Sequence, residues 1–555
     1  MMKINKFNTL VCVLALAAAA TGCSKFLDTS LDTQRQGEYL TTDRSTIWYF
    51  GYAFYSPLSG GFSRIDGNLF ATASDEAQQA SASSNVLYFN QGSINSSVNP
   101  ISGLYTNYYE GIRAANYFLD YVADGKGEEL LAQNRNLVTD QTGYKRDLES
   151  LNWMIAEAHI AKAYYYAELI KMYGGVPIIE DAAGSALVKR SSYDDCVDYI
   201  IGEIDGYKDQ LAENWNSYTD RGGRFTLGFA LALKARVLLY AASPLHNPDG
   251  DIAKWKKAAE AAKDFITDSR LSYSLASDYR SYFLGNAPLS SSETIYAVRS
   301  YTSNTLEAAN YPIATAGGAS GACPTENLVS QYERIADVDG GDRYAGLDPR
   351  FEASIVYNGS EWNGRTIAEG AGESDDMSAK NASPTGYYLK KFLNENLDLT
   401  YGATAQHNWV LFRYAELLLI YAEAVNEAFG PTAVPDGYPF SALDAIQQVR
   451  DRASVDLPAL NATTKSACRA AVKHERQIEL AFEDHRYWDL LRWNDAIEVL
   501  NNPVQGVEIA KSGDAYSYKV VDVATRTFYE RNYYLPFKLS EIQNANGTLE
   551  QNPGY

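Results

Sequence analysis

KRDLESLNWMIAEAHIAKAYYYAELIKMY, at residues 145–173, is the clearest indication of the fold of this chain. The stretch contains no Pro or Gly, and its apolar side chains recur at steps of three and four residues, which is the period of an amphipathic α-helix. It is followed by Gly174-Gly175-Val176-Pro177, in which a glycine suited to a helix C-terminus precedes a residue that cannot continue a helix. The sequence therefore predicts a long helix over 145–173.

Further stretches with the same period follow along the chain. TLGFALALKARVLLYAA, at residues 226–242, ends at Ser243-Pro244 and predicts a second long helix. Other helices are predicted at 193–211, around Trp255, at 413–429 and at 441–453. The spacing of large and small residues in Trp255-x2-Ala258-Ala259-x2-Ala262 is typical of a tetratricopeptide repeat, where small residues let neighbouring helices pack closely. We therefore expect several helix pairs that form one scaffold.

Two regions interrupt this helical pattern with Gly, Ser, Asn, Thr and Tyr. One covers residues 52–102 and the other covers residues 271–408, where TIYAV at 294–298 predicts a short strand. Long loops on a rigid scaffold usually carry function, and we expect these two regions to meet on one face. The sequence thus predicts a mainly α fold: a tetratricopeptide-like helix-pair scaffold with long loop-rich, partly β ligand-binding regions.

The first 28 residues have the pattern of a lipoprotein export signal. Lys3 and Lys6 precede an apolar run of about eleven residues, which is too short to span a bilayer, and small residues lead to Cys23. We predict that residues 1–22 are a signal peptide and that acyl chains on Cys23 anchor the mature protein to membrane lipid. No later stretch is long and apolar enough for a spanning helix.

Charge and cysteine usage exclude several classes of protein. The formal net charge is −21, and it becomes −23 when residues 1–22, with two lysines and no acid, are removed. A chain this acidic is not expected to bind nucleic acid, because nucleic acid is also negatively charged. The cysteines after position 23 show no CxxC spacing and the histidines no HExxH, so neither a disulfide framework nor a zinc site is indicated. No cofactor is expected, although the acidic turn at 337–342 offers carboxylates that could bind calcium.

Several longer phrases, in this order along the chain, resemble the SusD/RagB family of outer-membrane nutrient-binding lipoproteins. They are CSKFLD at 23–28, AEAHIAKAYYYAELIKMYGGVPII at 156–179, GRFTLGFALALKARVLLYAASP at 223–244, CPTENLVSQYE at 323–333, TGYYLKKF at 385–392, VLFRYAELLLIYAEAVNEA at 410–428, HERQIELAFEDHRYWDLLRW at 474–493 and LPFKLSEIQNANGTLEQNPGY at 535–555. The resemblance is weakest over 271–380. It implies a single SusD-like domain over 23–555, with a helical N-terminal part to about residue 270 and a C-terminal SusD/RagB part from about residue 271.

The resemblance also implies a function. Such a protein is not an enzyme: it binds oligosaccharides or polysaccharide fragments and passes them to a SusC-like TonB-dependent transporter. It would sit at the cell outer membrane, anchored through the lipid on Cys23 and facing the exterior. A peptide-binding member of the same family is an alternative, because aromatic and amide-rich loops also hold extended peptides. A surface glycoside hydrolase is a third reading, which requires two carboxylates about 5–9.5 Å apart across a cleft.

Sugar binding requires aromatic rings against C–H faces and polar groups for the hydroxyls. In the early loops, the resemblance places ligand contacts just before the helix that begins near Leu104, and the candidates there are Asp75, Tyr88, Phe89 and Asn90. The matching candidates in the central loops are Tyr301, Asn304 and Tyr311. Trp362 is a further candidate, but its setting also resembles a common family phrase that would make it structural.

The motif at 474–493 is interpreted as scaffold. Its spacing predicts one helical stripe formed by Glu475, Glu479, Phe482 and Arg486. His485 with nearby carboxylates could be read as an acid/base site, yet buried pairing of arginine with carboxylate explains the same residues, and no nucleophile accompanies them. Arg413 and Glu416 are interpreted as structural for the same reason.

Overall fold

The computed structural model describes residues 44–182, 187–218, 221–336, 342–513 and 515–555. The predicted signal peptide, Cys23 and residues 337–341 of the acidic turn lie outside the described residues. The chain divides into two compact units. Unit 1 comprises the described part of Met1–Phe50 together with Tyr121–Leu151, and unit 2 comprises Gly51–Asp120 and Asn152–Tyr555.

Three helices have residues in both units, and one lies wholly in unit 1. The three are α4 (Ser45–Ala53), α6 (Gly103–Val122) and α8 (Gln141–Tyr173), and the fourth is α7 (Lys126–Ala132). Within unit 1, Arg135 pairs with Asp147 at 2.5 Å and with Asp140 at 3.2 Å. The predicted helix over 145–173 is confirmed, and it ends where predicted, at Gly174 with φ +73°.

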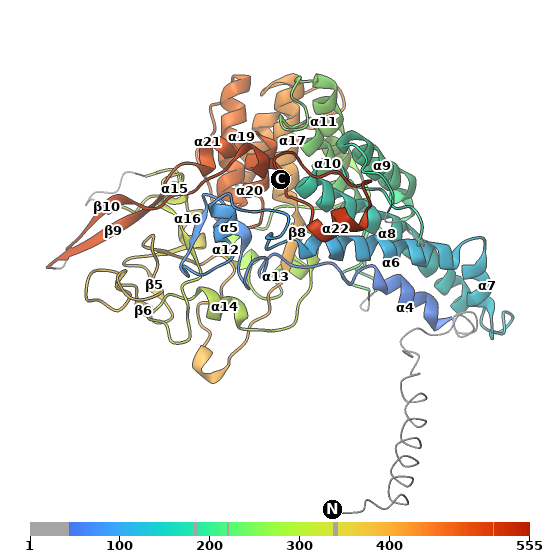
Figure 1. The fold of residues 1–555 in the computed structure, drawn as a ribbon, viewed down its shortest axis with the longest axis horizontal. Helices are drawn as coiled ribbons and strands as arrows, with labels where there is room; N and C mark the ends of the chain where they lie inside the picture. The colour runs from blue at the N-terminus through green and yellow to red at the C-terminus, as the bar shows by residue number, and fades with distance from the viewer. Residues whose placement is uncertain (1–43, 183–186, 219–220, 337–341, 514) are drawn as a thin grey trace, which may run out of the picture. The chain divides into compact units, whose positions relative to one another are not determined.

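The other long helices of unit 2 pack side by side (Figure 1). They are α9 (Tyr193–Tyr207), α10 (Leu227–Ala242), α11 (Ile252–Thr267) and α17 (Tyr414–Phe429), with α18 (Ala442–Arg450) and α19 (Lys465–Glu479) against α17. On α11, Trp255, Ala258, Ala259 and Ala262 are all buried, as close packing of helix pairs requires. The prediction of a mainly α scaffold of helix pairs is confirmed.

Local chemistry sets the ends of these helices. The Thr226 hydroxyl accepts a hydrogen bond from the Phe229 N–H at the start of α10, and Ser192 and Asp195 form a capping box at the start of α9. α9 ends at Tyr207 and continues as one 3₁₀ turn, η2 (Lys208–Gln210), so the predicted helix over 193–211 is slightly too long.

Short helices occupy much of the remaining chain. The α-helical ones are α5 (Leu87–Asn90), α12 (Tyr279–Tyr282), α13 (Ala287–Ser290), α14 (Thr305–Asn310), α15 (Glu326–Val329), α16 (Arg350–Ser354), α20 (Arg486–Arg492), α21 (Ala496–Leu500) and α22 (Leu539–Asn544). The other 3₁₀ turns are η1 (Phe70–Ala73), η3 (Leu399–Tyr401) and η4 (Glu530–Tyr533). Among the described residues, no helix is both long and apolar enough to cross a membrane.

The strands form small antiparallel pairs. The pairs are β1 (Ala77–Gln79) with β3 (Ala322–Pro324), β2 (Thr294–Val298) with β8 (Trp409–Arg413), β4 (Ile355–Tyr357) with β7 (Tyr387–Leu389), β5 (Glu361–Trp362) with β6 (Arg365–Thr366), and β9 (Val504–Ser512) with β10 (Ala515–Ala524). In the first pair, Ala77 lies opposite Pro324 and Gln79 opposite Ala322. The expectation that the early and central loop regions meet is therefore confirmed.

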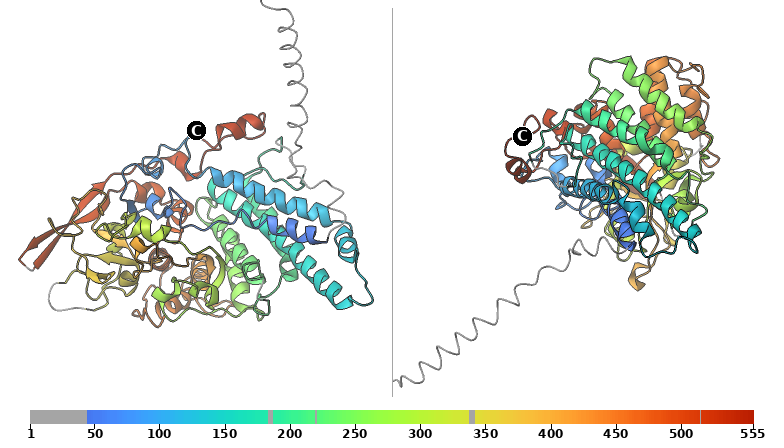
Figure 2. Two further views of the ribbon diagram at one scale, coloured as in Figure 1. Left: turned by 90° about the horizontal axis from the view of Figure 1, so that it is seen from below. Right: turned by 90° about the vertical axis from the view of Figure 1, so that its right-hand side faces the viewer.

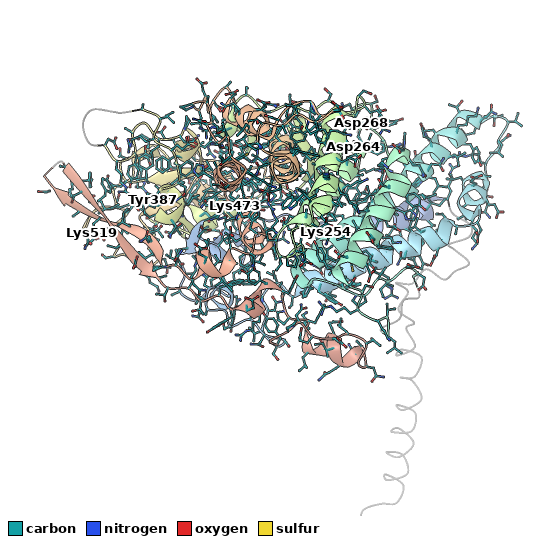
Figure 3. The ribbon with its side chains drawn as sticks, turned by 90° about the horizontal axis from the view of Figure 1, so that it is seen from above. Lys254, Asp264, Asp268, Tyr387, Lys473 and Lys519 are labelled. Atoms are coloured by element: carbon teal, nitrogen blue, oxygen red, sulfur yellow. The ribbon has the colours of Figure 1, made fainter. Side chains whose placement is uncertain are left out.

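The β9–β10 hairpin is anchored at its base and exposed towards its turn. At the base, Val504 and Val507 are buried and the Val507 N–H donates to the carbonyl of Thr385 at 2.9 Å. Figure 2 shows the hairpin projecting from the neighbouring short strands of unit 2. Lys519, labelled in Figure 3, lies on the exposed part.

The motif at 474–493 is not one helix, which corrects the predicted stripe. α19 ends at Glu479, and Phe482 and Asp484 have φ of +66° and +64° before α20 begins at Arg486. The main-chain carbonyl of Glu479 accepts hydrogen bonds from Arg413 Nη2 at 2.8 Å and from the Tyr279 hydroxyl at 2.8 Å. These side chains replace the helical N–H partner, so Phe482 and Arg486 leave the stripe that begins with Glu475 and Glu479.

Candidate functional site

Asp75 lies just before β1, where the two loop regions join. Its carboxylate accepts hydrogen bonds from Arg486 Nε at 2.9 Å and Nη2 at 2.8 Å. Burial alone would raise the pKa of Asp75, but the Arg486 guanidinium outweighs burial and holds that pKa below its usual value. The carboxylate thus ties the early loops to α20 in this structure.

The other early-loop candidates differ in exposure. Phe89 and Asn90 are each 5% exposed, and the Phe89 ring meets Phe70 and Tyr487 edge to face with centroids 5.1 and 5.9 Å apart. Tyr88, on the same short helix α5, keeps 37% of its surface exposed. Of this cluster, Tyr88 is the ring that a ligand can reach.

The central candidates separate in the same way. Tyr301 is 95% exposed, and Asn304 is half-buried at the start of α14. Tyr311 and Trp362 are fully buried and pack edge to face with centroids 5.2 Å apart, while the Tyr311 hydroxyl accepts from the Leu397 N–H at 3.2 Å. Burial gives Tyr311 and Trp362 a packing role in this conformation. Ligand contact by any of the candidate residues stays a prediction.

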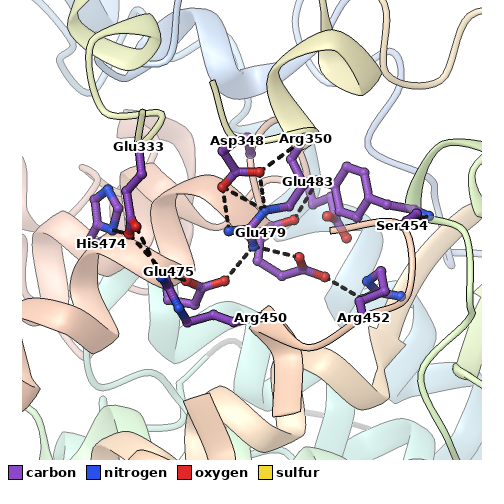
Figure 4. Close-up of polar contacts among 12 residues, drawn as sticks. Glu333, Asp348, Arg350, Arg450, Arg452, Ser454, His474, Glu475, Glu479 and Glu483 are labelled. Atoms are coloured by element: carbon purple, nitrogen blue, oxygen red, sulfur yellow. Dashed lines mark hydrogen bonds and ion pairs between the residues drawn. The ribbon is translucent and has the colours of Figure 1, made fainter. Parts of the chain in front are cut away.

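A network of buried ion pairs surrounds Glu479 (Figure 4). Its carboxylate accepts from Arg413 Nη1 at 2.6 Å, Arg452 Nη2 at 2.7 Å and Arg350 Nη1 at 3.0 Å. Although burial raises the pKa of Glu479, the three guanidinium groups outweigh it and hold that pKa far below its usual range. A carboxylate so engaged is a structural anchor and not a proton donor.

The network continues through neighbouring charges. Arg413 also pairs with Glu293 at 2.8 Å and with Glu483 at 2.7 Å, and Glu416 pairs with Arg236 at 2.6 Å. Burial first, and then Arg236, lowers the pKa of His485 well below its usual value, which keeps the imidazole neutral. The interpretation of these residues as scaffold is confirmed by their pairing.

A cavity of about 600 Å³ opens in unit 2 beside β2 and the start of α10. Aromatic side chains reach it from three segments that are distant in the sequence: Trp215 and Tyr218 precede α10, Tyr273 follows α11, and Tyr296 lies on β2. The Tyr296 hydroxyl donates to the carbonyl of Gly223 at 2.8 Å, and Trp215 Nε1 donates to that of Arg224 at 3.2 Å. These bonds hold the linker before α10 against β2.

Two rings in this cavity, those of Tyr218 and Tyr273, are half-buried and packed against neighbouring side chains. Tyr273 stacks on Phe265 with centroids 5.4 Å apart, and its hydroxyl lies so close to Gly228 that a Cβ there would stand 2.2 Å away. Tyr218 has the guanidinium of Arg221 at 4.5 Å from its ring centroid. A ring that its neighbours hold in place and that remains partly exposed is a rigid platform for an apolar sugar face.

Polar groups flank the rings. The amides of Asn214 and Asn216, the hydroxyls of Ser290 and Ser292 and the guanidinium of Arg299 line the cavity and are exposed or half-exposed. Of its described lining residues, Glu213 is the one that carries a carboxylate. These groups can bind the hydroxyls of a ligand whose apolar face lies on the aromatic rings. The pair of opposed carboxylates that a glycoside hydrolase requires is missing from this described lining.

The sequence reasoning missed these residues. Trp215 and Tyr218 sit in the linker between two predicted helices, 193–211 and 226–242, where ENWNSY at 213–218 offers a Trp and a Tyr beside amides. The composition of this linker was the available sequence signal for a binding site. Sequence alone could not show that the linker lies beside Tyr273 and Tyr296, because that depends on tertiary contacts. A second cavity of about 600 Å³ beside α15 has Tyr332 and Tyr344 in its lining, and these are only 4% and 3% exposed, so it presents no open ring.

Metal ligands do not gather in the part of the chain that the structure describes. There, no group of three or more His, Cys, Asp or Glu side chains is placed to hold a metal ion. The acidic turn at 337–342 is represented only by Asp342, which accepts a hydrogen bond from the Tyr344 N–H at 2.9 Å.

Comparison with known proteins places the chain in a family. One family model, described as the SusD family, matches residues 287–555, and another, described as starch-binding and associating with the outer membrane, matches residues 25–239. A SusD-like protein of Formosa agariphila is 25% identical over 386 residues, which are 64% of this chain and 68% of the relative. Another from the same organism is 24% identical over 436 residues, 76% of this chain and 77% of the relative.

Solved structures share the fold. A SusD-like protein from Bacteroides fragilis superposes with a TM-score of 0.75 at 24% identity, covering 93% of this chain and 98% of that one. Surface glycan-binding protein A from Bacteroides fluxus has a TM-score of 0.65 at 22% identity, covering 93% and 100%. Because two models of one family match most of its length, and the fold agrees, the chain belongs to the SusD/RagB family.

Proposed function

We propose that this protein is a surface lipoprotein of the outer membrane that binds oligosaccharides or polysaccharide fragments and passes them to a SusC-like TonB-dependent transporter. The cavity lined by Trp215, Tyr218, Tyr273 and Tyr296 carries this proposal, because the half-buried rings of Tyr218 and Tyr273 and the flanking amides have the chemistry of a sugar site. Family membership supports it, since one matching model is described as starch-binding and associating with the outer membrane.

Anchoring through Cys23 fits this function. Two or three acyl chains, at about 0.8 kcal/mol per buried methylene, would fix the body at the membrane surface, where a transporter partner works. Cleavage after residue 22 followed by acylation is tested by mass spectrometry of the N-terminal peptide of the membrane-extracted protein. An unmodified Met1 or a non-acylated Cys23 would contradict the anchor.

Capture without turnover is the second part of the proposal. A hydrolase would require paired carboxylates across the cleft, and Glu213 stands alone among the described lining residues. The buried carboxylates of the Glu479 network are paired with arginines. Glu479 itself is 0% exposed, so its carboxylate is not in contact with solvent. Neither group supplies the acid and base of glycoside hydrolysis.

The test is binding of the full-length lipoprotein, in detergent, to a panel of oligosaccharides and extended peptides. Hits are titrated by calorimetry, and the recovered ligand is analysed for cleavage. Binding of one saccharide class at about micromolar to millimolar Kd, with the ligand intact, is expected for a few stacked rings. Binding of peptides alone would favour a peptide-binding member of the family, and cleaved sugar would overturn the capture function.

The transporter partner is tested separately. Cross-linking of intact outer membranes followed by affinity capture of this lipoprotein is expected to yield a TonB-dependent barrel as the main adduct. A permanent lid on such a barrel would bury about 2,000 Å² or more. Recovery of the lipoprotein alone, under conditions where a known membrane complex is captured, would contradict the partnership.

A further inference from the structure

We propose that the cavity beside β2 selects saccharides that carry a negative group, a carboxylate or a sulfate, and that Arg299 is the residue that contacts this group. The inference rests on the proposed sugar binding and adds the class of sugar. It follows from the positions and the pairing of the charged side chains around the cavity.

Arg299 follows β2 and is held over a glycine turn. A Cβ placed on Gly222 would lie 2.1 Å from Arg299 Nη2, so the guanidinium rests directly against the backbone there. The next residue, Gly223, has φ +93°, a conformation that side chains rarely adopt. Gly222 and Gly223 leave room for the Arg299 side chain, and the contact places its guanidinium against this turn.

The charge of Arg299 is not balanced by the described protein. Arg224, in the same lining, binds Glu157 at 2.9 and 2.7 Å, and Arg270 binds Asp268 at 2.7 Å. Arg299 is exposed, and it forms neither an ion pair nor a side-chain hydrogen bond with any residue that the structure describes. A guanidinium so placed can offer two parallel N–H donors to a carboxylate or sulfate.

A second arginine adds to the positive potential. Arg221 lies over the Tyr218 ring at 4.5 Å and over the Trp153 ring at 5.5 Å, and it too forms no ion pair with a described residue. Arg221 stands beside the lining residue Tyr218 and is not itself part of the lining. The described lining contains three arginines, Arg224, Arg270 and Arg299, and one carboxylate, that of Glu213. In a chain with net charge −21, which repels anions at long range, such a local excess of positive charge is a specific feature.

The rings decide which kind of anion fits. The half-buried rings of Tyr218 and Tyr273 line the same cavity as Arg299, and so do the exposed residues Ser290 and Ser292. A small inorganic anion would use none of this surface. A sugar ring with an acidic substituent uses the aromatic surface, the hydroxyl partners and the charge together.

The test compares matched saccharides that differ only in charge. Oligogalacturonate is set against its methyl ester, and κ-carrageenan oligosaccharides are set against their desulfated form, each titrated into the full-length lipoprotein in detergent. We expect at least one charged member to bind about tenfold or more tighter than its neutral partner, and to weaken when salt rises from about 50 to 500 mM. Which pair shows the preference distinguishes a carboxylate from a sulfate.

Variants connect the preference to the residue. Arg299→Gln is expected to remove about tenfold of the affinity for the charged member and to leave the neutral member within about twofold. Arg299→Lys is expected to restore part of the loss. Lys519→Gln, which removes one positive charge from the exposed hairpin, is the matched control and is expected to change nothing (Figure 3).

The outcomes separate the two claims. Neutral and charged members that bind equally, or a charge preference that survives Arg299→Gln, would overturn the inference while sugar binding stands. Failure of every charged member to bind, with a neutral member bound, would do the same. Failure of all saccharides would overturn the inference and the proposed function together. Because Arg299 is exposed, unchanged circular dichroism and melting temperature are expected of each variant and are checked first.

Discussion

At the scale of the residue, buried charges in unit 2 hold main-chain groups as well as one another. Arg413 binds the carboxylates of Glu479 and Glu483 and also donates to the main-chain carbonyl of Glu479. Lys391 donates to the same carbonyl at 3.2 Å and binds Glu483 at 2.7 Å. The sequence predicted pairing of arginine with carboxylate, but it could not predict the end of α19, because the competing donors come from distant parts of the chain.

Removing one cation from this network should be costly. Arg413→Ala leaves the buried carboxylates of Glu293, Glu479 and Glu483 undercompensated, and we expect a loss of about 3–5 kcal/mol in the free energy of unfolding. Urea unfolding followed by tryptophan fluorescence measures it. Arg270→Ala is the control, since Arg270 pairs at the surface and should cost about 0–1 kcal/mol. Equal losses for the two variants would show that the buried network is not the anchor described.

Glu76 should make stability depend on pH. Burial, and then the nearby Asp75, raises the pKa of Glu76 to about 8 from an ordinary value of 4.5. The stabilisation from the neutral carboxyl is therefore complete below about pH 4.5 and is lost as pH rises through about 8. Glu76→Gln keeps an acceptor for the Phe482 N–H and removes the titration. As pH rises from about 4.5 to about 8, the free energy of unfolding of the variant should therefore increase relative to that of the parent, by on the order of a few kcal/mol.

Thermal melts of both proteins at several pH values measure this difference. The difference is the useful quantity because burial lowers the pKa of Lys391 to about 8, and this adds a pH dependence of opposite sign above that pH. A constant difference between parent and Glu76→Gln from pH 5 to 9 would show that Glu76 ionises normally in the folded protein.

At the scale of the element, the short β1–β3 pair joins two loop regions that lie far apart in the sequence. The Thr325 N–H donates to the Glu76 carbonyl at 3.0 Å, and the Ala80 N–H donates to the Gly321 carbonyl at 2.9 Å, which extends the pairing on both sides. The sequence predicted that these regions meet, because both are rich in turn residues. Their register was not predictable, since strands of three residues carry almost no periodic signal.

Gly321 is the position at which this joint should be most sensitive. Its φ is +34°, and a Cβ there would stand 2.3 Å from the Ala309 carbonyl oxygen and 2.4 Å from Asn310 Oδ1, which accepts the Ala322 N–H. We expect Gly321→Ala to cost about 1–3 kcal/mol and to speed amide exchange at 77–80 and 322–325. Exchange mass spectrometry localises the change.

Gly103 supplies the matched control. It begins α6, and nothing lies within 4 Å of an added Cβ, so Gly103→Ala should leave both stability and exchange at the joint nearly unchanged. Slow exchange at the joint in Gly321→Ala would indicate that the pairing tolerates a side chain and that the fit at Gly321 is looser than described.

At the scale of the whole molecule, the candidate site is assembled from linkers that the helical scaffold brings together. The long helices were predictable because their period is local, and the family was recognisable because its phrases lie in those helices and in the C-terminal segment. The cavity was not predictable, since residues 213–218, 270–273 and 288–299 meet only after α10, α11 and β2 have packed. Burial likewise placed Tyr311 and Trp362 in the core, a distinction that composition alone does not make.

The location of the sugar site can be tested by comparing two tyrosines. Tyr273→Ala removes a ring of the cavity, and for a stacked sugar we expect a loss of about 1–3 kcal/mol in binding free energy, by analogy with bases on aromatic rings. Tyr301→Ala removes a ring that is 95% exposed on the loops. If calorimetry shows that Tyr301→Ala alone weakens the bound saccharide, the site lies on the loops and not in the cavity.

The most direct measurement is a crystal structure of the protein with the saccharide that binds it best. We expect density for a sugar ring against Tyr273 or Tyr218 in the cavity beside β2, with its polar groups towards the Asn214 and Arg299 side chains. A saccharide bound elsewhere, at Tyr88 or Tyr301 for example, with an empty cavity, would show that this cavity does not capture the ligand.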